Sequence, residues 1–242
     1  MARRRFFVDE IISGRAQIVG DAAHHLTRVL RVEPGQKFEI SDNRNLYLAE
    51  VQTARKDLVS FVIGEQLQPA RSVVRIHLLA SLIRFERFEW LIEKATELGV
   101  EVITPIQAER SEKGLDRGAE KRTARWRKLA REASEQSRRA RLPEINAALS
   151  LTAALAIEAD HRWMLDEAEG VPHISSALPQ ARHQSDRVAL LVGPEGGWTD
   201  RERSAITEHA WRPVGLGNTI LRTETAAIAG IAVIAAAWQP LS

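Results

Sequence analysis

Two glycine-rich segments near the end of the chain are the strongest candidates for a ligand site. In the first, a buried-type apolar run at 190–192 leads directly into the turn Gly193–Gly197. In the second, the glycines of 215–217 precede the polar stretch Arg222–Thr225 and an apolar helix. Glycine allows backbone N–H and C=O groups to approach a ligand closely, and open α/β sheets bind ligands beyond the carboxyl ends of their strands.

Each segment also has a purely structural interpretation. Thr199 and Glu202 have the spacing of a capping box, so the first turn could simply start a helix. Thr223 or Thr225 could cap the helix that ends at Trp238 in the same way. That helix is rich in alanine and contains Gly230, so we expect it to pack into a core or a subunit interface.

Several common catalytic chemistries are excluded or lack their sequence signature. The chain has no cysteine, which excludes disulfides, thiolate metal sites and cysteine nucleophiles. The motifs G-x-S-x-G, H-E-x-x-H, G-x-G-x-x-G and the Walker A loop are absent. The seven histidines have no recognisable metal-ligand spacing. We therefore expect no bound metal.

The charge is concentrated in one block. The formal net charge is only +2, but residues 110–141 contain 12 basic and 5 acidic side chains. Such a block is typical of a surface that binds a polyanion, although a solvated helix face has the same composition. Composition does not distinguish RNA from DNA or from a phosphorylated small molecule.

The chain of 242 residues is long enough for one or two domains, and its pattern changes near residue 72. Residues 1–72 predict a small β-rich unit with short strands and a short helix capped by Asp21. From residue 73, strands alternate with helices, which predicts a parallel sheet covered on both faces. One of these strands, 100–103, should end at Pro105, and the basic block should form a helix with Trp126 and Ala130 inside.

Neither a signal peptide nor a membrane span is expected. Acidic residues follow within the first ten positions, before any apolar stretch of useful length. The longest uncharged apolar run, 226–238, is shorter than the roughly 20 residues that cross a bilayer. We expect a soluble, cytoplasmic protein with no membrane partner.

Taken in chain order, six stretches resemble one known family. The segments LVGPEGG and LGNTILRTETA carry most of the likeness, and weaker matches precede them. The matching stretches are 4–8, 24–31, 89–100, 125–137, 191–197 and 216–226. Together they resemble the ribosomal RNA small subunit methyltransferase E (RsmE) family, within the SPOUT class.

The chain departs from the family pattern in two places. Lys-Gly-Asp-Arg often follows the equivalent of Leu82 in the family, whereas this chain has Ile83-Arg84-Phe85-Glu86-Arg87. A basic residue often precedes the equivalent of Ile220, whereas this chain has Thr219. No role is therefore assigned to the Thr219 side chain.

The resemblance implies an α/β fold of two domains. Residues 1–72 would form a PUA-like RNA-binding β-barrel domain, and residues 73–242 a SPOUT α/β-knot methyltransferase domain with a deep trefoil knot. It implies S-adenosyl-L-methionine (SAM) as cofactor and a homodimer with the active site at the subunit interface. The implied reaction is methylation of N3 of a specific uridine in 16S rRNA, within the assembled small ribosomal subunit.

On this basis we assign three sets of residues. The cofactor set is Gly193, Pro194, Glu195, Gly196, Gly197, Leu216, Gly217, Ile220, Leu221, Arg222 and Thr223. The catalytic set is Arg222 and Glu224. The RNA-binding set is Arg3, Arg4, Arg5, Arg28, Arg31, Arg138 and Arg139.

More than one role is open for three of these residues. Glu224 and Glu195 are both candidates for the base that removes the uridine N3 proton. Either carboxylate could instead hold a loop, which we favour for Glu195. Arg222 could bind a phosphate or a uracil oxygen, or pair with one of these two carboxylates.

Two other functions remain open at this point. One is a SPOUT methyltransferase that modifies another rRNA or a tRNA nucleotide. The other is a non-catalytic RNA-binding module whose glycine loops are vestigial. A deletion strain distinguishes the first from the 16S assignment, and SAM binding distinguishes the second.

Overall fold

The computed structural model describes residues 4–69 and 73–239. The chain divides into two compact units, and we describe each by itself. The N-terminal unit comprises residues 1–71 together with 134–142, and the C-terminal unit comprises 72–133 and 143–242. Arg3 and residue 72, the predicted domain boundary, lie outside the described residues.

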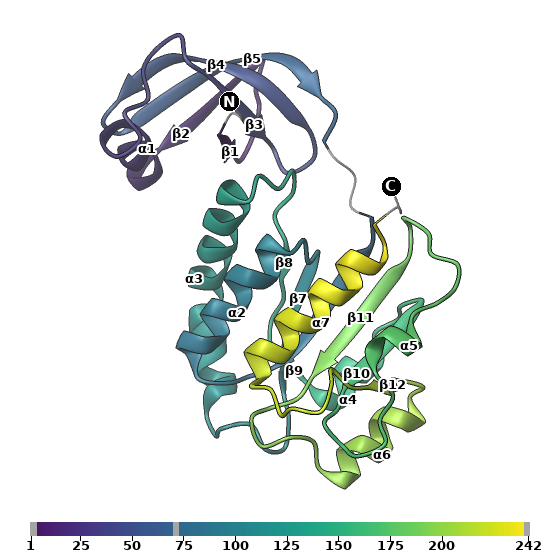
Figure 1. Ribbon diagram of the computed structural model, residues 1–242. Helices are drawn as coiled ribbons and strands as arrows, with labels where there is room; N and C mark the ends of the chain where they lie inside the picture. The colour runs from purple at the N-terminus through teal and green to yellow at the C-terminus, as the bar shows by residue number, and fades with distance from the viewer. Residues whose placement is uncertain (1–3, 70–72, 240–242) are drawn as a thin grey trace. The chain divides into compact units, whose positions relative to one another are not determined.

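The N-terminal unit is a five-stranded sheet in the order β1-β3-β4-β5-β2 (Figure 1). Its elements are β1 (Arg5–Phe7), β2 (Arg15–Val19), α1 (Gly20–Arg28), β3 (Lys37–Ser41), β4 (Leu46–Arg55) and β5 (Leu58–Leu67). β1 pairs with β3 in parallel, and the other pairs are antiparallel. Phe6, Ile40 and Phe61 are buried in its core, which confirms a small β-rich unit.

The start of α1 differs from the prediction. Asp21 lies in the first turn, Val19 occupies the N-cap position, and no side chain caps the helix. Asp21 still favours the helix, because a negative charge in the first turn interacts well with the helix dipole. The error arose because helix start signals locate a terminus only to within a residue or two.

Residues 134–142 are attached to the N-terminal unit by hydrogen bonds to its first strands. Ser41 Oγ donates to the Ala140 carbonyl (2.8 Å), and the Leu142 N–H donates to Asn43 Oδ1 (2.7 Å). Arg5 pairs with Glu39 at 2.7 Å and also donates to the Arg138 carbonyl. The Arg5 side chain is only 11% exposed. We therefore expect Arg5 to stabilise this attachment and not to bind RNA.

The C-terminal unit is built on a parallel sheet in the order β12-β10-β11-β6-β7-β8, with β9 also paired to β7. Its strands are β6 (Arg75–Ser81), β7 (Val102–Gln107), β8 (Glu144–Ile145), β9 (Leu149–Ser150), β10 (His161–Leu165), β11 (Arg187–Val192) and β12 (Arg212–Val214). Its helices are α2 (Phe85–Glu97), α3 (Leu115–Gln136), α4 (Leu151–Leu155), α5 (Ile174–Ala177), α6 (Asp200–Glu208) and α7 (Thr223–Ala237).

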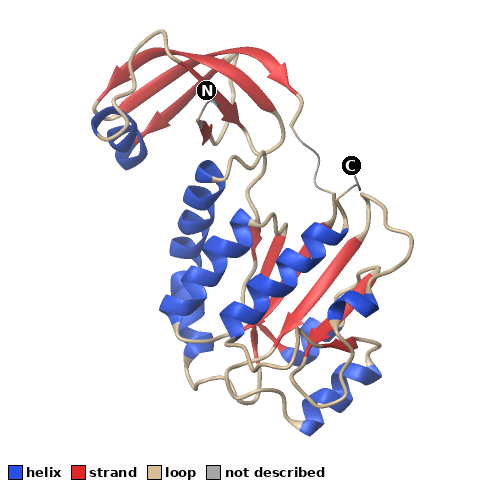
Figure 2. Ribbon diagram, in the orientation of Figure 1, coloured by secondary structure: helices blue, strands red, loops and turns tan. Residues whose placement is uncertain are grey.

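Helices cover both faces of this sheet, as predicted (Figure 2). Helices α2, α3 and α7 share one apolar core with alternate residues of β6 and β11. Helices α4 and α6 share a second core with the intervening residues of the same strands. Among the described residues, no helix is long and apolar enough to cross a membrane.

β7 does not end before Pro105, as the sequence predicted, but continues to Gln107. The two short strands that pair with β7 explain why it continues past Pro105. β8 pairs with Val102 and Ile103, and β9 pairs with Ile106 and Gln107. Pro105 lies in the gap between these two short partners, so its missing N–H leaves no ladder position unpaired.

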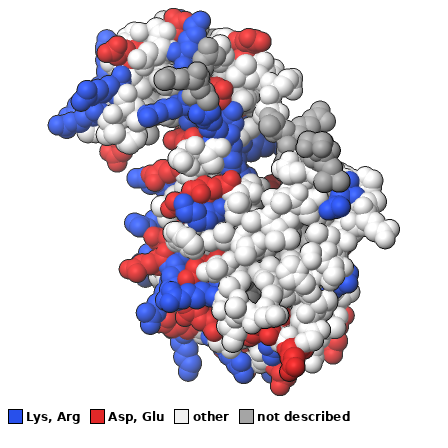
Figure 3. Space-filling view, in the orientation of Figure 1, with Lys and Arg blue, Asp and Glu red and all other residues white. Residues whose placement is uncertain are grey.

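The predicted basic helix is α3, with Trp126 and Ala130 buried on its inner side. Part of its charge is neutralised within the unit. Arg122 and Arg125 both bind Glu89 of α2, at 2.9 Å and 2.8 Å. Figure 3 shows basic and acidic side chains intermixed on this side of the molecule. The surface of α3 therefore carries less net positive charge than the sequence of the helix indicates.

His77 of β6 should make the C-terminal unit sensitive to acid. Its ring Nε2 lies 2.8 Å from the Thr104 hydroxyl, and burial lowers its pKa from 6.5 to about 4. Below pH 6.5 the unfolded chain takes up a proton that the folded chain excludes. We therefore expect His77 to cost roughly 3 kcal/mol of folding free energy as the pH falls from 6.5 to 4.

Urea unfolding of the wild type and of His77→Gln at pH 7.5, 5.5 and 4 measures this effect. Glutamine can keep a hydrogen bond to Thr104 but has no proton to take up. The carboxylates contribute equally to the pH dependence of both proteins, so their effect cancels when the two free energies of unfolding are subtracted. Parallel losses of stability in the two proteins over this range would show that His77 is not responsible.

Candidate functional site

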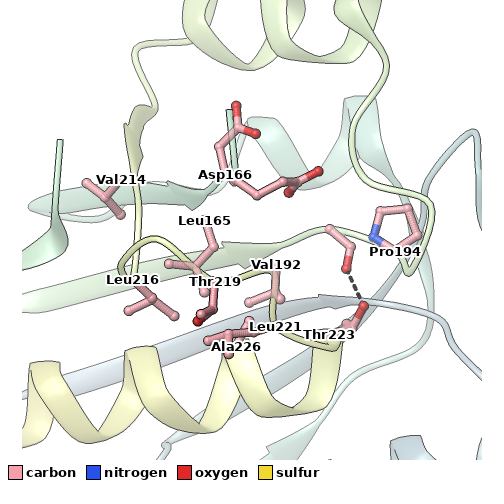
Figure 4. Close-up of a pocket in the computed structure, with 12 residues that line it drawn as sticks. Leu165, Asp166, Val192, Pro194, Val214, Leu216, Thr219, Leu221, Thr223 and Ala226 are labelled. Carbon is pink, nitrogen blue, oxygen red and sulfur yellow. Dashed lines mark hydrogen bonds between the residues drawn. The ribbon is translucent and has the colours of Figure 1, made fainter. Parts of the chain in front are cut away.

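One hollow in the C-terminal unit combines both glycine segments. It lies at the carboxyl ends of β10 and β11 and has a volume of about 470 Å³, including its open mouth (Figure 4). The lining residues are Leu165, Asp166, Glu167, Val192, Gly193, Pro194, Val214, Leu216, Thr219, Leu221, Thr223 and Ala226. The walls are mainly apolar, and two carboxylates lie on one side. This is where a parallel sheet is expected to bind a ligand.

Thr223 joins the two glycine segments directly. Its hydroxyl donates to the Gly193 carbonyl at 3.0 Å, as the dashed line in Figure 4 shows. The predicted capping role of Thr223 or Thr225 is wrong, because Arg222 occupies the N-cap position and no side chain caps α7. The Thr223 hydroxyl bonds to the neighbouring loop instead, which fixes the first turn of α7 against the end of β11.

Gly193 is required by close packing under the pocket. A Cβ atom at this position would lie 3.0 Å from the Trp198 ring. Trp198 is fully buried, and its indole N–H donates to the Leu165 carbonyl at 3.0 Å, so it has little freedom to move. A side chain at position 193 would therefore displace the pocket wall.

The rest of the first glycine turn is braced from outside the pocket. Gly197 has a φ of +68°, a conformation that favours glycine, and Arg110 donates to the Gly196 carbonyl at 2.9 Å. Thr199 and Glu202 form the predicted capping box, and Glu202 also accepts from the Glu109 N–H. Glu195, Gly196 and Gly197 are not among the lining residues of this pocket.

An acidic pair at the end of β10 was missed at the sequence level. Asp166 and Glu167 line the pocket, and Arg203 of α6 binds both Asp166 oxygens, at 2.9 Å and 3.1 Å. Arg203 also donates to the Trp198 carbonyl at 2.8 Å, and its hydrogen bond to Asp166 raises its pKa. The available signal was two carboxylates placed directly after a buried strand.

The alternative in which Arg222 pairs with Glu195 or Glu224 is wrong. Arg87 of α2, and not Arg222, contacts the Glu195 carboxylate and lies 3.9 Å from Glu224 Oε1. Glu224 is buried, and its Oε2 has no hydrogen-bond partner within residues 4–69 and 73–239. The Arg222 carbonyl accepts from the Ala226 N–H at 2.8 Å, but the exposed Arg222 side chain makes no hydrogen bond or ion pair with any residue in the described part of the chain.

Comparison with known proteins decides the family. A family model described as an RNA methyltransferase domain matches residues 70–235, and one described as an RNA methyltransferase PUA domain matches 18–64. Ribosomal RNA small subunit methyltransferase E of Bacillus subtilis is 33% identical over 90% of this chain and 88% of its own length. The chain belongs to the ribosomal RNA small subunit methyltransferase E family.

Other family members and solved structures agree over nearly the full length. The Mycobacterium tuberculosis member is 32% identical over 99% of this chain and 95% of its own. The Neisseria gonorrhoeae member, solved bound to S-adenosyl methionine, has a TM-score of 0.86 at 29% identity and covers 98% of both chains. A putative methyltransferase from Legionella pneumophila, solved with SAM, reaches 0.88 at 28% identity, again over 98% of both chains. The fold is thus confirmed as α/β with a PUA-like N-terminal domain, while the trefoil knot stays a prediction.

The pocket of this family member uses only part of the predicted cofactor set. Gly193, Pro194, Leu216, Leu221 and Thr223 line it. The remaining predicted members are outside its walls: Glu195, Gly196, Gly197, Gly217, Ile220 and Arg222. Ile220 is 85% exposed, so its side chain does not enclose a ligand in this structure.

The predicted RNA-binding residues that the structure describes all fall in the N-terminal unit. Arg4, Arg28, Arg31 and Arg138 are exposed, and Arg139 is half-buried. Sequence reasoning treated Arg138 and Arg139 as part of the long helix, but they follow its end at Gln136. Among the described residues, no group of three or more His, Asp or Glu side chains could hold a metal ion.

Proposed function

We propose that this chain transfers the methyl group of SAM to N3 of a specific uridine in 16S rRNA. The observation that carries the proposal is the pocket that joins both glycine loops at the carboxyl edge of the sheet. Two solved structures that match nearly the whole chain are described with SAM bound. The relatives that match it are named as small subunit rRNA methyltransferases.

The residues of the pocket fit this cofactor. Leu216, Leu221 and Val192 offer apolar surface to an adenine ring, and the adjacent loop backbone offers hydrogen-bonding groups. The Glu167 side chain is 46% exposed at the pocket, and its ion pair with Arg203 is long at 3.8 Å, so its negative charge suits a ligand with cationic groups. When bound, SAM would supply an electrophilic methyl group on a positively charged sulfur.

The catalytic roles that we propose follow from burial and pairing. Glu224 provides a buried carboxylate in the first turn of α7, beside the pocket residues Thr223 and Ala226. Arg222 provides an exposed guanidinium for a phosphate or a uracil oxygen of the target nucleotide. Positioning of the two substrates supplies much of the acceleration in a displacement of this kind.

The N-terminal unit, which includes residues 134–142, is the proposed RNA-binding domain, and the C-terminal unit is the proposed methyltransferase domain. Phosphate contacts by exposed arginines orient an RNA without reading its sequence. Specificity would then come from the fold of the assembled small subunit and from extrusion of the uridine. Such a protein works in the cytoplasm, where ribosomal subunits are found.

A homodimer is proposed from the surface of α7. After its polar first turn this helix is apolar on every side, yet Ile228, Ala229, Ala232 and Val233 remain partly exposed. Figure 3 shows that the surface over α7 and β11 is free of charged side chains. An uncharged helix face of this kind is typical of an obligate subunit contact.

Replacing Arg138 and Arg139 by alanine should weaken RNA binding about tenfold and reduce its salt dependence, because two phosphate contacts are lost. The affinity for SAM should change less than twofold, since the pocket lies in the other unit. Binding to small ribosomal subunits at several salt concentrations measures the first effect, and calorimetry with SAM the second. The matched control replaces Arg201 and Arg212, two exposed arginines of the C-terminal unit. Equal losses in both double variants would show that no specific contact was removed.

The function itself is tested by methyl transfer. The purified chain is incubated with methyl-labelled SAM and with small subunits from a strain that lacks this gene, and the labelled nucleoside is identified by mass spectrometry. N3-methyluridine in 16S rRNA supports the proposal. Label in 23S rRNA or tRNA favours the first alternative function, and no binding of SAM favours the non-catalytic module.

A further inference from the structure

A guanidinium held between two carboxylates lies beside the pocket. Arg87, in the first turns of α2, contacts the Glu195 carboxylate with Nη1 and places Nε 3.9 Å from Glu224 Oε1. We propose that Arg87 is a positioning residue that holds the Glu224 carboxylate so that Oε2 accepts the N3 proton of the target uridine. This inference rests on the function proposed above.

The burial of Glu224 is the first argument. Its side chain is 8% exposed, and Oε2 is a buried oxygen without a hydrogen-bond partner in the described structure. An unsatisfied buried acceptor is costly, and folded proteins contain few of them. A substrate N–H directed at Oε2 would remove this cost during the reaction.

The location of Glu224 is the second argument. It lies in the first turn of α7, next to Thr223 and two residues before Ala226, both of which line the pocket. Thr223 is bonded to the Gly193 carbonyl, so this turn cannot easily rotate away from the cofactor loop. The backbone of Glu224 is therefore held at a fixed place next to the lining of the proposed methyl-donor site.

The unequal environments of the two Glu224 oxygens are the third argument. Oε1 faces Arg87 at 3.9 Å, whereas Oε2 has no hydrogen-bond partner among the described residues. Glu195 lies on the other side of Arg87 and is 45% exposed, so its ion pair contributes little stability by itself. Its effect is to fix the direction of the guanidinium toward Glu224.

Methyl transfer to N3 requires the loss of the N3 proton. The N3–H bond breaks and its proton passes to Glu224 Oε2, giving a neutral carboxylic acid. The N3 electron pair forms the new bond to the methyl carbon, and the carbon–sulfur bond breaks with its electrons left on sulfur. The products are N3-methyluridine and neutral S-adenosylhomocysteine, and Glu224 later loses its proton to water.

Steady-state methyl transfer to small subunits that lack the modification tests this assignment, together with SAM affinity and thermal midpoints. Glu224→Gln should lower kcat by about 10²–10⁴-fold, the usual contribution of a positioned base, while the KM for RNA changes less than threefold. Arg87→Gln should lower kcat at least tenfold with the same unchanged KM. Arg87→Lys, which keeps the charge, should recover part of that loss.

The double variant separates positioning from other roles. If Arg87 acts through Glu224, then Arg87→Gln should cause little further loss in the Glu224→Gln background. A matched control is the exposed pair Arg75–Glu101 at the other end of β6, where Arg75→Gln removes the same kind of bond (2.7 Å) and should leave kcat unchanged.

Each contrary result has a distinct meaning. An Arg87→Gln variant that raises the KM for RNA equally in both backgrounds would overturn the assignment in favour of direct RNA contact. Loss of SAM binding and of thermal stability together would show that Arg87 only maintains the fold. Wild-type activity with an equally active Glu224→Gln variant overturns the inference alone, whereas an inactive wild-type chain overturns the proposed function and this inference with it.

Discussion

Replacing Ala226 by tryptophan should raise the dissociation constant for SAM at least 100-fold, equivalent to about 2.7 kcal/mol of binding free energy. Ala226 lines the pocket and is only partly buried, so a larger side chain can extend into the hollow without displacing the core. An indole group would then occupy much of the space that the adenosine moiety needs. Isothermal titration calorimetry of the purified protein measures the effect.

The matched control for this prediction is Ala153→Trp. Ala153 is an exposed residue of α4, outside the pocket lining, and receives the same change in size and polarity. It should leave SAM affinity within twofold of the wild type, and both variants should keep the wild-type circular dichroism spectrum. Unchanged SAM binding by a folded Ala226→Trp variant would mean that the cofactor binds elsewhere.

The sequence alone would place such a blocking side chain at Gly196, in the middle of the glycine turn. The structure shows why this choice is less direct. A Cβ atom at Gly196 would lie 3.2 Å from the Arg110 side chain, on the outer side of the turn. A large residue there would disturb the bracing of the turn before it reached the pocket, so a loss of binding would be hard to interpret.

Local features of the fold were predictable because they depend on neighbouring residues. Three examples depend only on residues that are close together in the sequence. They are the Thr199–Glu202 capping box, the buried strand before Gly193 and the buried positions of α3. Features that depend on distant partners were not. Pro105 is accommodated only because β8 and β9 leave a gap opposite it, and no local pattern indicates that gap.

In the candidate site, too, the features set by local sequence were predicted and those set by distant partners were not. The two glycine loops were found from their composition, since glycine turns after buried strands are visible in one segment of sequence. Arg87 was not found, because its role depends on α2 passing beside the first turn of α7, more than 130 residues later in the chain. For Arg222, pairing with a carboxylate was only the alternative to a contact with the target nucleotide, and that alternative is wrong because Arg222 lies at the N-cap position with its side chain exposed.

The ion pair between Arg203 and Asp166 should be the most stabilising polar contact beside the pocket. Asp166 is 3% exposed and is bound through both oxygens, and Arg203 also holds the Trp198 carbonyl. Replacing Arg203 by methionine leaves a buried carboxylate without a counter-charge, which typically costs 3–5 kcal/mol. We take the lower value, about 3 kcal/mol, because Arg203 is 28% exposed.

A loss of this size should lower the thermal midpoint by about 10 °C in a protein of this length. Arg201→Met is the matched control, because Arg201 is an exposed arginine on the same helix, and it should shift the midpoint by less than 2 °C. Differential scanning fluorimetry with and without SAM measures both. SAM affinity should also fall in Arg203→Met, since Asp166 and Glu167 form one side of the pocket.

The double variant Asp166→Asn with Arg203→Met identifies the physical cause. Asparagine removes the buried charge that Arg203 no longer balances, so the double variant should be more stable than Arg203→Met alone. Its SAM affinity should stay low, because the link from α6 to the Trp198 carbonyl is still missing and the wall under Gly193 is less constrained. If the two losses of stability simply add, Arg203 stabilises the loop through its backbone contact and the buried carboxylate needs no counter-charge.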